Sequence, residues 1–176
     1  MKEQPKNNAK WRQTGFFDNR YTLYKNEVRW GDIVFAGFEK GVFTIEEKHL
    51  ELQKEYKQFI LKQANSTIAF VEQKGKNIKA LIQKSKQTLT VSLNKKGITT
   101  CQIDGEKGVI QIFNPDPRNN GWASIQVKGD IDQELLDISI FIGLFFKRKI
   151  MLFRAYFFGI AMAIVLIVFI LSYFWL

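Results

Sequence analysis

The chain has 176 residues, and its formal net charge of +9 comes from 26 basic and 17 acidic side chains. It contains a single cysteine, Cys101, which excludes an intrachain disulfide and is typical of proteins in the reducing cytosol. The basic excess favours anionic partners, such as a membrane surface or a nucleic acid.

The first ten residues, MKEQPKNNAK, are polar, so we expect residues 1–10 to be disordered and not to act as a signal peptide. Beyond them, short segments rich in β-branched and aromatic residues mostly alternate with the period of a strand. The expected strands are WRQTGFF, RYTLYK, DIVFAGF, KHLELQK, KQFILKQ, TIAFVEQ, NIKALIQ, TLTVSL, ITTCQI, GVIQIF and WASIQV. Turn signals such as DGEKG separate them, and the absence of a βαβ rhythm argues against a parallel sheet.

Residues 44–64 fit either of two structures. Thr44 and Glu47 have capping-box spacing, and a series of mainly apolar residues after them shares one helical face. We nevertheless expect strands here, because the neighbouring segments are strands and ELQKEYKQF can form a hairpin.

Residues 135–146 form an apolar run that is shorter than the roughly 20 residues of a membrane span, so we expect a buried helix. Either Asp130 or Asp132 would cap its start, and a basic cluster follows its end, which complements the helix dipole. Ser139 and Gly143 share one face, and this small-residue stripe would let a neighbouring backbone come close.

Residues 155–176 form a second apolar run, which contains no charged residue and is long enough to cross a membrane as a helix. All basic residues lie before it, and 25 of the 26 lie within residues 1–150 together with every acidic residue. The positive-inside rule therefore predicts a single-pass protein of the cell membrane with its N-terminal domain in the cytoplasm.

The element order resembles that of a known family. The segment YKQFILKQANSTIAFVEQ and the later NNGWASIQVKGDIDQELLDISIFIGLFFKRK are similar to the bacterial tubby C-terminal-like domains, which are relatives of LURP-one-related proteins and phospholipid scramblases. The resemblance covers roughly residues 20–150. It implies a mainly β, α+β fold, namely a closed antiparallel β-barrel of about twelve strands around a central hydrophobic helix.

The expected domain organisation follows from this resemblance and from the two apolar runs. Residues 11–149 would form the barrel domain, with the central helix at residues 132–147. Residues 150–176 would supply a juxtamembrane segment and then a separate transmembrane helix. A bacterial pleckstrin-like domain, with fewer strands and an amphipathic closing helix, is the alternative fold.

Catalytic and metal-binding patterns find little support in the sequence. His49 is the only histidine, and Cys101 within ITTCQI is expected to be a buried strand thiol and not a nucleophile. The acidic DGEKG segment lacks the ligand spacing of a calcium loop, and NKKG is not a phosphate-binding fingerprint. We therefore expect no enzyme activity, no cofactor and no metal.

The charge distribution gives the main functional hypothesis. Residues 74–96 contain seven lysines and no acidic residue, which predicts contact with anionic phospholipids at the inner leaflet. The candidate lipid-binding residues are Lys74, Lys76, Lys84, Lys86, Lys95, Lys96, Lys147, Arg148, Lys149 and Arg154. Nucleic acid is a weaker candidate, because the membrane anchor argues against it.

A second hypothesis belongs to a different class. The domain would be a protein-interaction or accessory subunit of a membrane complex that has no lipid ligand. Tubby domains bind phosphoinositides, but none of their basic binding residues is matched to a residue of this chain. Lipid scrambling is a weaker option still, because one span offers no hydrophilic path for headgroups.

Overall fold

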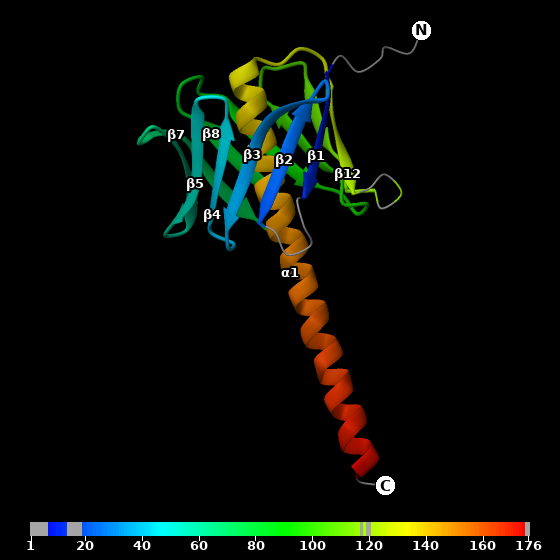
Figure 1. Ribbon diagram of the computed structural model, residues 1–176. Coiled ribbons are helices and arrows are strands. Elements are labelled where there is room, and N and C mark those ends of the chain that lie inside the picture. The colour runs from blue at the N-terminus through cyan, green and yellow to red at the C-terminus, as the bar shows by residue number, and fades with distance from the viewer. Residues whose placement is uncertain (1–6, 14–18, 117, 119–120, 175–176) are drawn as a thin grey trace.

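The computed structural model describes residues 7–13, 19–116, 118 and 121–174, which form twelve strands and one helix (Figure 1). The strands are β1 (Asn7–Gln13), β2 (Arg20–Lys25), β3 (Val28–Ala36), β4 (Lys40–Ile45), β5 (Lys48–Glu55), β6 (Gln58–Gln63), β7 (Ser66–Lys74), β8 (Asn77–Ile82), β9 (Thr88–Leu93), β10 (Thr99–Ile103), β11 (Val109–Ile112) and β12 (Trp122–Lys128). The helix α1 (Gln133–Phe174) follows the last strand.

The strands close into one antiparallel barrel. Each strand pairs with its neighbours in the chain, and β1 also pairs with β12. Ala9 of β1 thus lies opposite Lys25 of β2 on one side and opposite Ile125 of β12 on the other. The predicted mainly β fold with about twelve antiparallel strands in a closed barrel is confirmed, whereas the alternative with fewer strands is wrong.

The alternation of side chains explains why these segments become strands. In β8, Ile78, Ala80 and Ile82 are buried, and the residues between them are exposed. Tight turns join many of the strands. Asn26 and Glu27 both have positive φ, as the turn type that suits a two-residue hairpin requires.

Residues 44–64 form strands, as predicted. β5 and β6 pair as a hairpin, and Tyr56 at its turn has a φ of 55°. Leu50 and Leu52 are both buried, which fits the two-residue period of a strand. The local helical pattern of residues 44–64 is therefore overridden by the burial of these strands within the barrel, because tertiary context routinely overrides local secondary-structure preference.

β4 is a strand that the sequence analysis did not identify. Its second residue, Gly41, is depleted in strands because it has no side chain to pack. Packing explains why position 41 is a glycine, because a Cβ atom there would lie 2.9 Å from Cδ2 of Phe145. Gly41 leaves the space that the phenylalanine ring of α1 occupies.

The predicted start of the barrel is also corrected. Residues 7–10 belong to β1 and not to a disordered N-terminus, while residues 1–6 of that prediction lie outside the described residues. Ala9 and Trp11 of β1 are buried, and the strand hydrogen-bonds to β2 and β12. The barrel needs this strand for closure, which overrides its polar composition.

The two predicted helices are one. α1 runs from Gln133 to Phe174, so the segment KRKIMLFR continues the helix instead of separating a barrel helix from a second one. This segment contains neither proline nor glycine to end a helix. Asp132 caps its start, since Asp132 Oδ1 accepts hydrogen bonds from the backbone N–H of Glu134 (2.9 Å) and of Leu135 (3.2 Å).

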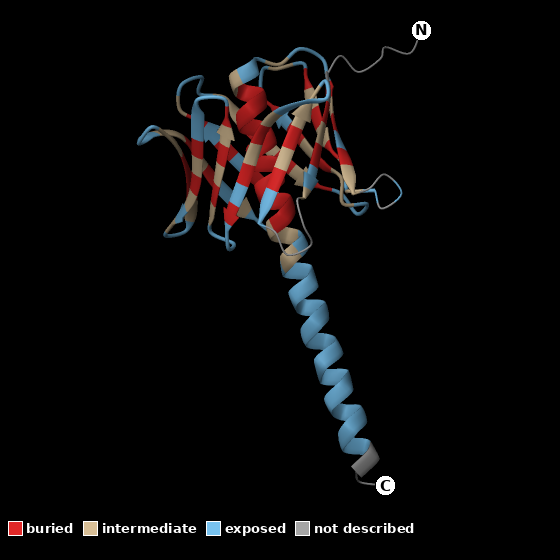
Figure 2. Cartoon of the chain, viewed as in Figure 1, coloured by how far each residue is buried: buried red, intermediate tan, exposed pale blue. Residues whose placement is uncertain are grey.

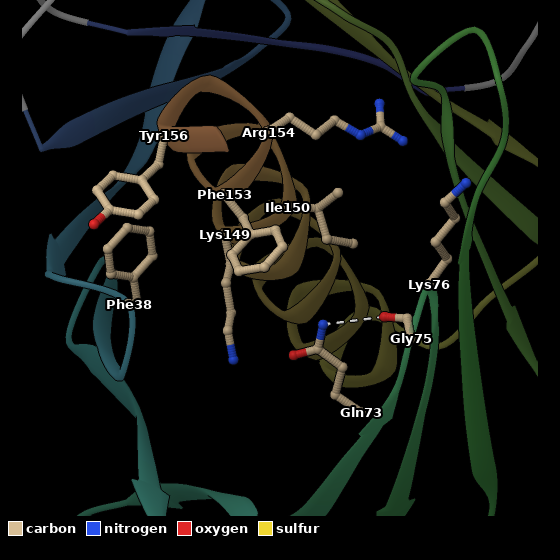
Figure 3. A pocket seen from close by; sticks show the side chains of 9 residues that line it. All are labelled: Phe38, Gln73, Gly75, Lys76, Lys149, Ile150, Phe153, Arg154 and Tyr156. Atoms are coloured by element: carbon tan, nitrogen blue, oxygen red, sulfur yellow. Dashed lines mark hydrogen bonds between the residues drawn. The ribbon is translucent and has the colours of Figure 1, made fainter. Parts of the chain in front are cut away.

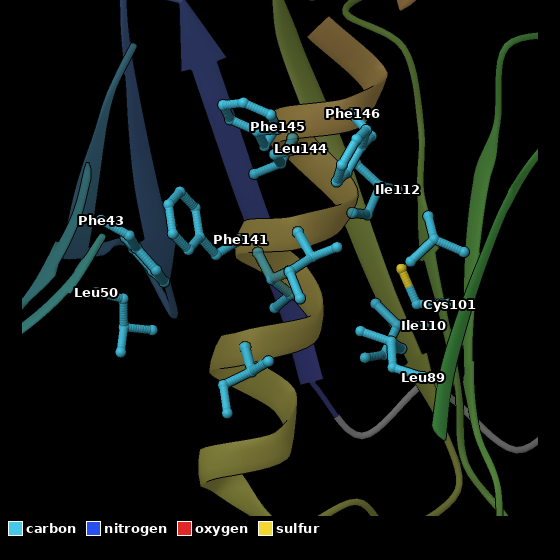
Figure 4. Packing of buried hydrophobic residues seen from close by; sticks show 14 of the residues in the cluster. Phe43, Leu50, Leu89, Cys101, Ile110, Ile112, Phe141, Leu144, Phe145 and Phe146 are labelled. Atoms are coloured by element: carbon cyan, nitrogen blue, oxygen red, sulfur yellow. The ribbon is translucent and has the colours of Figure 1, made fainter. Parts of the chain in front are cut away.

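Burial divides α1 into two parts. Residues 135–148 are buried, whereas nearly all residues from 151 to 172 are exposed (Figure 2). On one face of the buried part, large rings reach toward β3, β4 and β6. The Phe141 ring lies 5.6 Å from the Phe43 ring (Figure 4). The Phe145 ring lies 5.5 Å from the Phe59 ring and 6.1 Å from the Phe35 ring.

The opposite face of the buried part carries the small residues. Cys101 Sγ of β10 donates a hydrogen bond to the Ser139 carbonyl at 3.6 Å, and a Cβ atom on Gly143 would lie 2.9 Å from the same Sγ. Ser139 and Gly143 therefore let side chains of the barrel wall come close, and the predicted approach of a neighbouring backbone stays a prediction. Since β10 and β4 lie six strands apart in the closed order, α1 contacts opposite sides of the barrel.

Candidate functional site

The up-and-down topology gives the barrel two distinct ends. We name them the start end, where α1 begins, and the exit end, where α1 leaves the strands (Figure 1). The described connections at the start end are 26–27, 46–47, 64–65, 83–87, 104–108 and 129–132. Those at the exit end are the described part of 14–19 (Asn19), 37–39, 56–57, 75–76, 94–98 and the described part of 113–121.

Side-chain contacts of α1 with the connections agree with this division. At the start end, Lys84 Nζ lies 3.0 Å from the Glu134 carboxylate in the first turn of α1. At the exit end, Arg148 donates a hydrogen bond to the Gly37 carbonyl at 3.3 Å.

The two ends carry opposite charge. Among the described connections, those at the exit end contain five basic residues (Lys57, Lys76, Lys95, Lys96 and Arg118) and two acidic ones (Glu39 and Asp116). Those at the start end contain three basic residues (Lys84, Lys86 and Lys107) and seven acidic ones (Glu27, Glu46, Glu47, Asp104, Glu106, Asp130 and Asp132). The barrel therefore has a basic end, and the exposed part of α1 leaves from that end.

The structure brings only part of the predicted lipid-binding set together. Six of those residues lie exposed or half-buried at the exit end: Lys74, Lys76, Lys95, Lys96, Lys149 and Arg154. Lys84 and Lys86 lie in the β8–β9 connection at the start end, which separates them from the other eight. The hydrogen bond from Lys84 to Glu134 also raises the pKa of Lys84, so this lysine already has a protein partner.

Lys147 and Arg148 are corrected to a structural role. They are 2% and 8% exposed, and both donate hydrogen bonds to backbone carbonyls of exit-end connections. Lys147 binds the carbonyls of Gly97 and Ile112, and burial lowers its pKa to about 8. Arg148 also lies 4.6 Å above the Phe35 ring. These two cations hold α1 to the rim of the barrel and do not present their charge to a ligand.

Exposed aromatic residues at the exit end are the features that the sequence analysis missed. Phe38 in the β3–β4 connection is 46% exposed, and Tyr56 at the β5–β6 turn is 99% exposed. Phe153 and Tyr156 on α1 are also exposed just beyond the rim. An aromatic residue at the tip of a tight turn is the signal that would have identified Tyr56, because turns usually carry small polar residues.

A pocket of about 740 Å³ lies between the rim and the emerging helix (Figure 3). Its lining consists of Phe38, Gln73, Gly75, Lys76, Lys149, Ile150, Phe153, Arg154 and Tyr156. Figure 3 shows Phe38 and Tyr156 side by side at one edge, whereas the Lys76 and Arg154 side chains extend at the other. The Lys149 ammonium lies 4.3 Å from the centre of the Phe59 ring, and desolvation lowers its pKa.

The other reactive side chains lie in settings that do not form a catalytic pair. Cys101 is the buried strand thiol that was predicted, and burial raises its pKa to about 12. His49 is exposed on β5, where its Nδ1 lies 3.1 Å from Thr44 Oγ1. In the part of the chain that the structure describes, no group of three His, Cys, Asp or Glu residues is placed to hold a metal ion.

Within the described residues, α1 is the one helix whose length and apolar composition suit a membrane span. Comparisons with protein-family models, curated proteins and solved structures found no match to this chain. The resemblance to the tubby-like family therefore stays a prediction, and the function has to be argued from the two ends of the barrel and from α1.

Proposed function

We propose that the protein is a membrane-anchored cytoplasmic binding module whose exit end contacts anionic phospholipids of the inner leaflet. The two parts of α1 would have different roles. Its buried part would be the central helix of the barrel, and residues 155–174 would cross the membrane. The observation that carries the proposal is that the apolar, exposed part of α1 leaves the barrel from its basic end.

The exposed part of α1 supports the membrane assignment. Residues 155–172 carry no charge, and their large side chains are exposed, for example Val165 at 62% and Phe169 at 68%. Burying such apolar surface away from water is strongly favourable, at about 25 cal/mol per Å². At 1.5 Å per residue, residues 155–174 extend for about 30 Å, which matches the hydrocarbon thickness of a bilayer.

The flanking charges support the orientation. Arg154 directly precedes the uncharged segment, and no basic residue follows it in the sequence. An excess of Lys and Arg marks the cytoplasmic side of a span. The barrel would therefore lie in the cytoplasm, with its exit end at the membrane surface.

The exit end has the chemistry of a surface that contacts headgroups. Each basic residue near an anionic leaflet contributes about 1 kcal/mol. Lys57, Lys95 and Lys96 are exposed there, and none lies within ion-pair distance of a carboxylate in the described chain. Phe38 and Tyr56 add aromatic rings, which favour the interface between headgroups and acyl chains. The order of twelve strands followed by a hydrophobic helix also supports the tubby-like resemblance.

Two matched turns at opposite ends of β5 allow a direct test. Lys57 and Glu47 are each the second residue of a turn whose first residue, Tyr56 or Glu46, has positive φ. We would label Lys57→Cys or Glu47→Cys in the full chain with a fluorophore, since the buried native Cys101 will not react. The protein would then be reconstituted into phosphatidylglycerol-containing vesicles with headgroup-level quenchers.

We expect quenching of the label at residue 57 and none at residue 47. The quenching should weaken in purely zwitterionic vesicles. Reporters fused before Met1 and after Leu176 should appear on opposite sides of the membrane. Equal quenching at the two turns, or both reporters on one side, would contradict the proposal. Quenching at neither turn, with the reporters still on opposite sides, would favour the protein-interaction hypothesis.

A further inference from the structure

We propose that the pocket between α1 and the rim binds one molecule of anionic phospholipid. Lys76 and Arg154 would hold the phosphate, and Phe38, Ile150, Phe153 and Tyr156 would contact the glycerol and the first acyl carbons. This inference rests on the proposed function, because the lipid would enter from the membrane that α1 crosses.

The shape of the pocket suits one lipid better than a diffuse surface. Its volume of about 740 Å³ falls within the range of small-ligand sites, which is about 300–1,000 Å³. Three separate elements build its walls, namely the β3–β4 connection, the β7–β8 turn and the turns of α1 around Phe153. The Gln73 side chain donates a hydrogen bond to the Gly75 carbonyl at 3.1 Å, which holds the β7–β8 turn in place (Figure 3).

The charges on the pocket suit a single negative headgroup. Lys76 and Arg154 lie at the same edge of the pocket (Figure 3). In the described chain neither is within ion-pair distance of a carboxylate, and no acidic residue lines the pocket. Glu39, the acidic residue of the adjoining connection, pairs with Lys54 at 2.5 Å. The two cations are therefore available to an outside anion.

The position of the pocket along α1 favours a lipid over a soluble anion as its ligand. Phe153 and Arg154 are the last residues before the uncharged segment, so the pocket lies at the headgroup level in the proposed orientation. A soluble anion would use the two cations but leave the aromatic and aliphatic walls in water. A phospholipid would occupy both parts of the pocket. Its phosphate would bind the two cations, and the adjoining glycerol and acyl carbons would contact the aromatic and aliphatic walls.

Native mass spectrometry of the full chain in detergent, with added phosphatidylglycerol or phosphatidylcholine, tests the inference. We expect one retained phosphatidylglycerol and little phosphatidylcholine. Lys76→Gln with Arg154→Gln should lower retention by about fivefold for each basic residue removed. The control Lys86→Gln with Lys107→Gln removes two exposed charges at the start end, far from the pocket, and should leave retention unchanged. All four side chains are exposed, so these substitutions remove no core contact.

Three results would overturn the inference. The first is a wild-type chain that retains no phosphatidylglycerol, and the second is an equal loss in the pocket pair and the control pair, which would indicate a diffuse charge effect. The third is displacement of the lipid by millimolar inorganic phosphate, which would indicate a soluble-anion site. If the label at residue 57 is still quenched by headgroup quenchers in any of these cases, the proposed function stands and only the pocket assignment fails.

Discussion

Gly143 of α1 packs directly against Ile112 of β11, so closely that a Cβ atom on residue 143 would lie 2.7 Å from Ile112 Cδ1. Cys101 Sγ, on the adjacent strand β10, would lie 2.9 Å from the same atom. This contact brings the small face of α1 against the barrel wall and leaves room for the phenylalanine rings on the other face.

The first prediction concerns this contact. Gly143→Val should lower the free energy of unfolding of the barrel by about 1–3 kcal/mol or more, because two buried side chains block the added atoms. Gly159 on the same helix has no atom within 4 Å of its Cβ position, so Gly159→Val should leave barrel stability unchanged. Thermal unfolding in detergent, followed by tryptophan fluorescence, measures both. Equal stability of the two variants would refute the packing that we describe.

The second prediction concerns the ring face of α1. Phe141 is fully buried and contacts Phe43, so Phe141→Ala should cost about 3–5 kcal/mol. That is a large part of the usual 5–15 kcal/mol of domain stability. Phe157, which is 55% exposed on the same helix, supplies the control Phe157→Ala. A barrel that unfolds at the same denaturant concentration in both variants would show that α1 does not fill its interior.

The third prediction concerns pH and the buried Lys147. Burial lowers its pKa in the folded chain to about 8, against an ordinary value of 10.5. Between these two values the unfolded state binds more protons than the folded state, so the Lys147 contribution makes stability rise with pH from about 8 to 10.5. Lys147→Met removes this contribution and keeps the aliphatic stem.

The measurement is the difference between wild type and Lys147→Met across that pH range, by denaturant unfolding in detergent. The difference isolates Lys147, because Cys101 titrates in both chains. The pKa of Cys101 is raised from 9.0 to about 12, so its contribution has the opposite sign and makes stability fall as pH rises above 9. Parallel pH curves for the two chains would show that the Lys147 ammonium is not desolvated.

The fourth prediction compares two pairs of lysines with equal charge. Lys95→Gln with Lys96→Gln at the exit end should reduce the headgroup quenching of a label at residue 57 in phosphatidylglycerol vesicles. Lys84→Gln with Lys86→Gln at the start end should not change it. The effect should shrink in high salt, because exposed charges are screened beyond about 10 Å at 0.1 M. A reduction of the same size for both pairs would mean that the barrel has no preferred end toward the membrane.

Much of the fold was predictable from the sequence, because inward and outward residues alternate in strands such as β8 and β9. The strand β4 was not, since the reason for Gly41 is the Phe145 ring, which lies more than a hundred residues away in the chain. The continuity of α1 was missed for a similar reason. A basic cluster between two apolar runs looks like a linker until Lys147 and Arg148 are seen to bind carbonyls of the barrel rim.

The candidate site was predicted in part, and strand direction explains the rest. Residues 74–96 form one basic segment in the sequence, but successive connections of an up-and-down barrel lie at alternating ends. Lys76 and Lys95 therefore both lie at the exit end, whereas Lys84 and Lys86 lie at the start end. The exposed position of Tyr56 depends on its place at a hairpin turn, which the competing helix pattern obscured.

Because α1 is continuous from its buried part into its exposed part, the rotation of the exposed part about the helix axis is fixed relative to the barrel. Each residue inserted between Lys149 and Arg154 would turn Arg154 and the apolar segment after it by about 100° relative to the barrel and move them 1.5 Å away. An insertion of two residues would thus point Arg154 and Tyr156 away from Lys76 and Phe38, whereas four residues would nearly restore their facing. The length of this short segment therefore sets which face of the exposed part of α1 lies over which connection of the barrel rim.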